Sequence, residues 1–551
     1  MSLKPESVPP IPEETERVAK AVFPKGNIYM RMRDQLGTFY QDEQFASLFP
    51  NQGQPAECPW RLALISVMQF VENLSDRQAA EAVRARIDWK YALSLELTNP
   101  GFDYSVLSEF RSRLMDGDME QELLDTMLTA FNARGLIKKR GKQRTDSSHV
   151  IAAIRDLNRL ENLGETLRAA LNSVAIVAPE WLTQIAHPDW FDRYEKRIEE
   201  YHLPKGEAVR KEYAEMIGVD GMRLLTAVYS DDSPDCLAHI PAVETLRRTW
   251  VHQYYVIDDK LRLRKSEDLP PASLRSDSPY DPEAHYGTKR TTHWTGYKIH
   301  LTESCDEDKP HLITNVETTS ATRTDVEMTE PIHKALAGKD NLPKEHLVDN
   351  GYVSADLLIK SQDDYHVELV GPVRYGNHWQ ATENTGYAID NFDIDWEART
   401  VTCPQGHTTR DWTPTYDAKK NPVIRARFAR SVCASCESRL LCTHAVKDGR
   451  SMTLRANQSQ YQVLRDIRQQ QETSEWKERY AKRAGVEGTL SQGIRAFELR
   501  QTRYIGLSKT HLQHILTAVA INIVRVDNWL IGTPFAKTRI SRFKAIEPKA
   551  A

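Results

Sequence analysis

The spacing of apolar residues changes along this chain, and that change constrains the fold more than any other feature. Residues 60–134 and 151–174 repeat apolar side chains at helical spacing. At 297–301 the repeat becomes two residues, which predicts a β-strand. Similar patterns predict a strand at 312–316, a helix at 324–337, a strand at 346–349, a helix at 354–361 and a strand at 367–373. This order predicts an α/β core, a mixed sheet with helices on its faces.

Helical patterns precede and follow this core in the sequence. Ser75 and Gln78 form a capping-box pattern at the start of one predicted N-terminal helix. These helices carry several arginines, so they could form a DNA-binding bundle or a plain helical domain with solvated charges. We expect a helical N-terminal domain at 1–134, the first core strand at 135–150, a helical insertion at 151–285, the rest of the sheet at 286–384, a small β insertion at 385–450, and basic C-terminal helices at 451–551.

The charge balance limits how the chain could bind nucleic acid. The sequence has 73 Lys and Arg against 77 Asp and Glu, a net charge of −4, so any nucleic acid must be held by local patches. One such patch contains Lys138, Lys139, Arg140, Lys142 and Arg144. A run of this kind is either a solvated loop or a clamp for phosphates. Residues 481–551 form a second basic region, with twelve Lys and Arg against four Asp and Glu.

Neither the N-terminal residues nor the cysteine content points to secretion or to a membrane. The stretch MSLKPESVPPIPEETE has no apolar core, so no signal peptide is predicted. The longest apolar run, near 515–524, is about half the ~20 residues that a membrane span needs. Seven cysteines in 551 residues are too few for a disulfide scaffold. We expect a cytoplasmic, nucleoid-associated protein with no membrane partner.

Four of the cysteines are clustered and have the spacing of a metal site. They are Cys403, Cys433, Cys436 and Cys442, in the pattern C-x29-C-x2-C-x5-C. Four thiolates bind Zn²⁺ tetrahedrally and can hold together a zinc-ribbon-like sheet with little core. His407 or His444 could replace one thiolate, and four ordinary reduced thiols are the alternative.

Three acidic residues lie at the ends of predicted elements. Asp146 follows a short extended run, Asp349 ends a strand, and Glu487 shares a helical face with Tyr480 and Arg483. Three carboxylates from separate elements can hold two Mg²⁺ ions ~4 Å apart, the arrangement used for phosphodiester chemistry. Taken singly, each residue also has a plain interpretation: an N-cap for Asp146, a turn for Asp349, and an ion pair with Arg483 for Glu487.

Several blocks of the sequence resemble a known family. They are SDRQAAEAVRARIDWKYAL, RTDSSHV, DPEAHYGTKRTTHWTGYKIHLTE, HLVDNGYV and RYAKRAGVEGTLSQGIRAFELRQTRY. Together these blocks resemble bacterial insertion-sequence transposases of the DDE class. The resemblance implies an RNase H-like core in which Asp146, Asp349 and Glu487 are the catalytic residues and hold two Mg²⁺ or Mn²⁺ ions.

The last block also matches a Y-x-x-R-x-x-x-E signature at Tyr480, Arg483 and Glu487. By the resemblance, its Tyr and Arg contact phosphate near the cleaved bond. Some related transposases have a Lys seven residues after the Glu. That position is Ile494 here, so we assign the phosphate contact to the neighbouring Arg495.

The resemblance implies a DNA transposase that cuts at the ends of its mobile element and joins them to target DNA. Its expected partners are double-stranded DNA, both the inverted-repeat ends and the target, and a second copy of the chain, because two ends must be held together. Lys138, Lys139 and Arg140 are further candidates for DNA contact. A structure-specific nuclease on the same core and a catalytically inactive, zinc-stabilised DNA-binding protein remain the alternatives.

Overall fold

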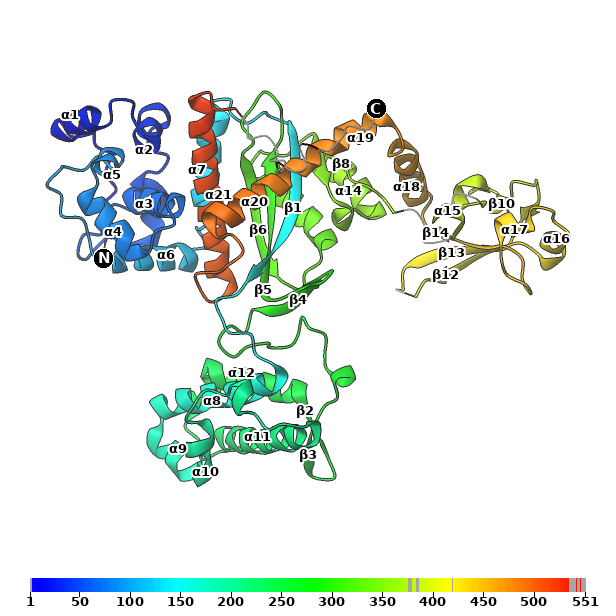
Figure 1. The fold of residues 1–551 in the computed structure, drawn as a ribbon, viewed down its shortest axis with the longest axis horizontal. Coiled ribbons are helices and arrows are strands. Elements are labelled where there is room, and N and C mark those ends of the chain that lie inside the picture. The colour runs from blue at the N-terminus through cyan, green and yellow to red at the C-terminus, as the bar shows by residue number, and fades with distance from the viewer. Residues whose placement is uncertain are drawn as a thin grey trace.

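The computed structural model describes residues 2–374, 379–382, 386–418, 420–534, 542 and 546. A central sheet lies among three other groups of elements (Figure 1). These are the N-terminal helices, a helical insertion that hangs from the sheet, and a small β unit beyond α18. None of the described helices is long and apolar enough to cross a membrane.

The central sheet is mixed and has six strands. They are β1 (Lys142–Ile151), β4 (His285–Lys289), β5 (Thr292–Ser304), β6 (Ile313–Ser320), β7 (Glu345–Val348) and β8 (Glu368–Val370). The order is β4-β5-β1-β7-β8, and β6 pairs with β5. β1 is antiparallel to β5 and parallel to β7, which is parallel to β8. This arrangement agrees with the mixed α/β core predicted from the sequence.

β1 is buried although most of its residues are polar, because its side chains have partners in neighbouring elements. Gln143 donates to the Asn341 carbonyl at 2.7 Å, and Thr145 Oγ1 lies 2.6 Å from His346 Nε2. Burying a polar group costs little free energy when its hydrogen bonds are made. A polar strand therefore lies at the centre of the sheet.

The N-terminal helices share one apolar core with the sheet. They are α1 (Glu13–Val22), α2 (Ile28–Arg31), α3 (Pro59–Val71), α4 (Asp76–Ala85), α5 (Ile87–Ala92), α6 (Ser105–Asp116) and α7 (Glu122–Ala133). The capping box of Ser75 and Gln78 is confirmed at the start of α4. Trp60 of α3, Ile299 of β5 and Ile515 of α21 (Leu507–Leu530) belong to the same buried cluster. α21 contacts α3, α7 and β6, so it joins the helices to the sheet.

The insertion after β1 has a core of its own. It contains α8 (Arg159–Val177), α9 (Pro179–Ile185), α10 (Pro188–Tyr194), α11 (Glu207–Val228), α12 (Pro241–Gln253), β2 (Tyr254–Ile257) and β3 (Lys260–Leu263). The helix expected from residue 151 was placed too early. Ile151 is the last residue of β1, and Asn158 caps α8 by accepting from the amides of Leu160 and Glu161. The apolar residues before the cap belong to the strand end and to a loop, whose Ile154 packs on the main core.

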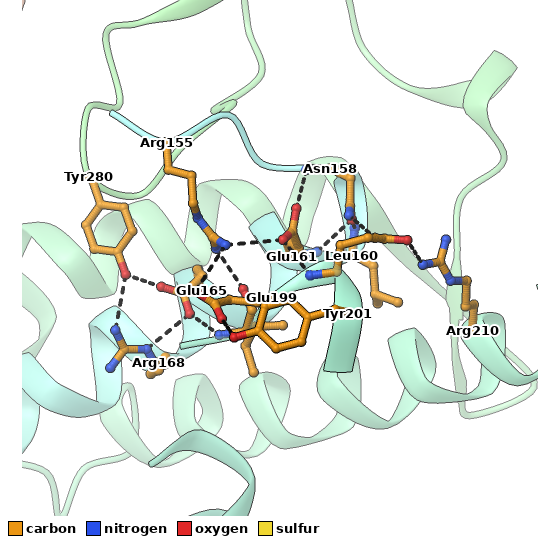
Figure 2. Close-up of polar contacts among 12 residues, drawn as sticks. Arg155, Asn158, Leu160, Glu161, Glu165, Arg168, Glu199, Tyr201, Arg210 and Tyr280 are labelled. Atoms are coloured by element: carbon orange, nitrogen blue, oxygen red, sulfur yellow. Dashed lines mark hydrogen bonds and ion pairs between the residues drawn. The ribbon is translucent and has the colours of Figure 1, made fainter. Parts of the chain in front are cut away.

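Two buried glutamates tie together the segments that enter and leave the insertion (Figure 2). Glu161 of α8 pairs with Arg155 on the entering segment at 3.3 Å. Glu165, one turn later, pairs with Arg168 at 3.1 Å and accepts from the hydroxyl of Tyr280 on the leaving segment. Because both connections meet at α8, the base of the insertion is fixed by charge-assisted hydrogen bonds.

The C-terminal part of the chain begins with α13 (Thr329–Gly338) and α14 (Ala355–Tyr365), which pack on β7. The small β unit holds α15 (Trp379–Thr382), β9 (Asp393–Asp395), β10 (Thr400–Thr402), β11 (Thr408–Thr409), β12 (Trp412–Tyr416), β13 (Pro422–Arg427), α16 (Arg430–Ala434), α17 (Arg439–Cys442) and β14 (Ser451–Arg455). α18 (Gln458–Gln470), α19 (Ser474–Ala481) and α20 (Gly485–Phe497) then return to the sheet (Figure 1). Residues 535–541, 543–545 and 547–551 of the expected basic C-terminal segment lie outside the described residues.

Candidate active site

The structure brings Asp146, Asp349 and Glu487 together around one arginine. Asp146 lies in β1, and Asp349 directly follows the neighbouring parallel strand β7, where Thr145 pairs with Val348. Two adjacent parallel strands therefore present their acids side by side. Arg483, in the short turn between α19 and α20, approaches Asp146 at 2.7 Å, Glu487 at 2.9 Å and Asp349 at 4.0 Å.

The plain interpretations of two of these acids also hold. Asp349 Oδ1 accepts from the amide of Gly351 at 2.7 Å and caps a short 3₁₀ turn, and Glu487 is ion-paired with Arg483. Neither contact uses all the oxygens of its carboxylate, since each carboxylate has about four lone-pair positions. The same groups can therefore serve the local structure and a ligand.

Burial and the opposite charges nearby shift the pKa values of Asp146 and Arg483 in opposite directions. Burial raises the pKa of Asp146, and the nearby Asp349 raises it further, while the Arg483 guanidinium works in the opposite direction. Burial alone would lower the pKa of Arg483, but the charge of Asp146 and the other acids leaves that pKa raised. Glu487 is the outermost acid, with its side chain 62% exposed. The site is thus strongly negative and already attracts one positive group.

A buried ion network holds α20 against the sheet. Glu303 of β5 is fully buried between Arg144 of β1 and Arg525 of α21, each at 2.7 Å. Thr489 of α20 donates to the same carboxylate at 2.5 Å. Gly485 begins α20 directly over the Arg144 guanidinium, where a Cβ would overlap it. This network fixes the helix that carries Glu487 relative to the strand that carries Asp146.

The other residues of the signature lie in different surroundings. Tyr480 stacks on Trp476 with ring centroids 4.8 Å apart, and its pKa is raised chiefly by burial. Arg495 is exposed in the last turn of α20. Tyr480 is close enough to be influenced by all three acids, whereas no contact joins Arg495 to them in the described ranges.

The basic run at 138–144 is mostly engaged within the protein. Arg140 donates to the carbonyls of Tyr365 and His366, and Lys139 pairs with Asp340 at 3.0 Å. Lys138, Lys139 and Arg140 all lie in the segment before β1. These residues lie before the first residue of β1, while Asp146 is the fifth residue of that strand, so the structure does not bring them to the acids.

Three residues near the acids were missed by the sequence analysis. Asp325 lies between Thr324 and Glu327, which form a capping box at the start of a short 3₁₀ helix. The Asp325 carboxylate, however, accepts from Ser147 Oγ at 3.1 Å. Lys289 Nζ lies 3.5 Å from the same hydroxyl. Lys289 and Ser147 were inside the recognised blocks, but only a known contact could have distinguished them from their neighbours.

The four clustered cysteines line one small cavity of about 20 Å³. Gly406, with φ +80°, turns the chain so that its amide donates to the Cys403 carbonyl, and the Cys403 amide donates to the His407 carbonyl. Burial raises the pKa of the Cys442 thiol to about 11, and the nearby thiols of Cys403, Cys433 and Cys436 also act to raise it. Within the described part of the chain, no group of three or more His, Cys, Asp or Glu is arranged to hold a metal ion.

Two family models match the chain. The one described as "Transposase DDE domain" covers residues 402–526, from the small β unit to α21, and includes Glu487. The one described as "Transposase domain (DUF772)" covers residues 17–113, in the N-terminal helices. No curated protein and no solved structure matches the chain.

A DDE domain defines an enzyme that cleaves DNA and transfers strands with the help of divalent metal ions. The two matches support a DNA transposase of the DDE class of insertion sequences, as the motif blocks indicated, with DNA as its substrate. Asp146 and Asp349 lie outside both matched ranges, so their assignment depends on the geometry around Arg483.

Proposed function

We propose that Asp146, Asp349 and Glu487 are the catalytic acids of this transposase, on an RNase H-like core. The observation that carries the proposal is that one guanidinium, that of Arg483, lies within ion-pair distance of all three carboxylates. The strand order supports it, because Asp146 lies in the first strand of the sheet and Asp349 ends the strand parallel to it. A later helix supplies Glu487, as the resemblance implies.

The chemistry of the three side chains suits divalent metal ions, although in the described arrangement Arg483 lies among the carboxylates and they do not yet form a metal-holding group. Carboxylate oxygens are the ligands that Mg²⁺ and Mn²⁺ prefer, and the position of Arg483 indicates that the site favours positive charge. Two ions bound there would activate the attacking oxygen and stabilise the leaving oxygen of a phosphodiester. The Arg483 guanidinium also explains how the three carboxylates can lie close together, because its positive charge offsets their mutual repulsion.

Water attacks the phosphodiester at each element end, the P–O3′ bond breaks, and a 3′-hydroxyl is freed. That hydroxyl then attacks a phosphodiester of the target, so that a new P–O3′ bond forms while the target's own 3′-oxygen leaves. Once bound cations neutralise the three carboxylates, the Arg483 guanidinium can pair with the phosphate. Tyr480 positions the DNA strand beside Arg483. Arg495, Lys138, Lys139 and Arg140 contact the DNA backbone farther from the acids.

The N-terminal helices recognise the inverted repeats, and two copies of the chain act together on two ends. Supporting this, the N-terminal helices share the core of the sheet, so an end bound there is held rigidly relative to the acids. The arginines of these helices are largely structural, however. Arg86 pairs with Glu72 at 2.5 Å, and Arg111 pairs with Asp76 at 2.6 Å.

The four clustered cysteines hold one structural Zn²⁺ in the small β unit, which is zinc-ribbon-like. The thiols meet at one cavity, and Gly406 gives the first of them a knuckle turn. Four thiolates leave no open position on the ion, so this Zn²⁺ has no catalytic part.

The experiment uses the full chain with duplexes that carry the inverted repeats flanking its gene. In Mg²⁺ we expect 3′-ends to be cut, and pre-cleaved ends to be joined to a target plasmid. Cutting without joining would make the protein a nuclease, and metal-independent binding without cutting would make it an inactive DNA-binding protein.

A further inference from the structure

A lysine outside the signature lies beside the first catalytic acid. Lys289 ends β4, at the tip of the β4–β5 hairpin, where it pairs with Thr292. Its Nζ lies 3.5 Å from the hydroxyl of Ser147, the residue after Asp146. The charge of Lys289 also acts to lower the pKa of Asp146.

The hairpin that carries Lys289 is packed firmly onto β1. Gly287 lies over the buried ring of Trp294, where an added Cβ would come within 2.6 Å of the indole. The Trp294 indole N–H donates to the Tyr297 carbonyl at 2.9 Å, and the ring lies 5.3 Å from that of His149 in β1. The hairpin backbone that carries the exposed Lys289 is therefore held in place by packing.

The Ser147 hydroxyl, which Lys289 contacts, is oriented by a second set of contacts. Ser147 Oγ donates to Asp325 at 3.1 Å, which leaves its lone pairs free to accept from Lys289. Asp325 is itself paired with Lys298 at 3.3 Å, and Lys298 donates to the Arg323 carbonyl at 2.6 Å. Lys298 thus has an acidic partner and a carbonyl partner, whereas the contact of Lys289 among the described residues is the long one to Ser147.

Lys289 retains unused hydrogen-bonding capacity. An ammonium has three N–H donors, and the long contact to Ser147 uses one of them. No carboxylate in the described ranges pairs with Lys289. An exposed cation with spare donors, held next to a carboxylate cluster that receives DNA, suits a phosphate group.

We propose that Lys289 binds a backbone phosphate of the DNA strand that enters the three acids. The proposal rests on the proposed function, because it requires the acids to receive DNA. Lys289 would hold the strand close to the reacting bond from the β4–β5 hairpin, whereas Arg483 reaches the acids from the turn between α19 and α20.

The test compares Lys289→Gln, Lys289→Arg and Lys211→Gln in the full chain. Lys211 is an exposed lysine on α11 of the insertion and serves as the matched control. Binding to an inverted-repeat duplex is measured without divalent metal over a range of salt concentrations. For K289Q we expect about tenfold weaker binding and a salt-dependence slope smaller by about 1. K289R and K211Q should bind as the unaltered protein does.

A scan of single uncharged methylphosphonates along the duplex identifies the contact. One or two positions near the cleaved bond should weaken binding by the unaltered protein and leave K289Q unchanged. An unchanged salt slope for K289Q, or a scan identical to that of the unaltered protein, would overturn the proposal. An active Asp349→Asn variant would instead overturn the proposed function, whatever K289Q does.

Discussion

Arg483 Nη2 lies 2.7 Å from Asp146 Oδ2, so a positive charge already lies among the three acids. Both side chains are largely buried, and the same guanidinium reaches Glu487 and Asp349. A guanidinium in this position lowers the repulsion between carboxylates that would otherwise face one another. It also means that divalent ions must compete with a charge that belongs to the chain.

Replacing Arg483 with Gln should reveal that competition. The variant leaves Asp146 without its counter-charge, so we expect the unfolding free energy of the metal-free protein to fall by about 1–3 kcal/mol. Excess Mg²⁺ should raise the unfolding temperature of R483Q more than that of the unaltered protein, because the ions then supply the missing charge. Calorimetry with and without Mg²⁺ measures both effects. Equal Mg²⁺ responses in the two proteins would contradict this view of Arg483.

The attachment of α20 to the sheet can be tested with two glycines of that helix. A Cβ at Gly485 would overlap the Arg144 guanidinium, so we expect Gly485→Ala to cost about 1–3 kcal/mol of stability and to slow DNA cleavage by displacing Glu487. Gly488 faces open space, and Gly488→Ala should be neutral or stabilise the helix by up to ~1 kcal/mol. Chemical unfolding and a cleavage assay distinguish them, and similar losses in both variants would show that the contact with Arg144 is unimportant.

Much of the sheet could be predicted from the alternation of apolar and polar residues, but β1 could not. The strand predicted at 297–301 lies inside β5, where one face is apolar. β1 has no such alternation, because Gln143, Arg144 and Thr145 are buried through specific partners elsewhere in the chain. Partners that lie far apart in sequence leave no periodic signal, so only the family resemblance indicated this strand.

The candidate site was likewise predictable from the sequence only in part. A strand followed by Asp349 and Gly351 is a local pattern, and the spacing of Arg483 and Glu487 is helical. The contact of Asp325 with Ser147 has no signal in the sequence around Asp325, where Thr324 and Glu327 form a capping box. Residues that reach the site across the sheet, such as Lys289, are identified only by their contacts.

Zinc should be present in the protein and bound by the clustered cysteines. We expect about one Zn²⁺ per chain by elemental analysis, lost in Cys436→Ser and retained in Cys236→Ser, whose thiol is exposed in the insertion. Losing the ion should also lower the unfolding temperature, because metal binding contributes to folding. Zinc-free protein with an unchanged unfolding temperature would argue for ordinary thiols.

Buried histidines predict acid sensitivity. Burial lowers the pKa of His333 and His511 to about 4, and that of His300 and His514 to about 3. Below the ordinary pKa of about 6.5, the unfolded chain binds protons that the folded protein does not. The unfolding free energy should therefore fall as pH falls from 6.5 toward 4, by about 1.4 kcal/mol per pH unit for each histidine. Urea unfolding at several pH values should give a shallower slope for His511→Gln, and an identical slope would contradict the assignment.

The central claim is that three distant acids form one metal-dependent site, and Asp349→Asn tests it most directly. The full chain, the variant and a matched control, Asp363→Asn on the exposed side of α14, are incubated with an inverted-repeat duplex and Mg²⁺. We predict that D349N binds the duplex but cleaves it at least about a thousandfold more slowly, while D363N cleaves normally. Cleavage by D349N at the rate of the unaltered protein would contradict the account.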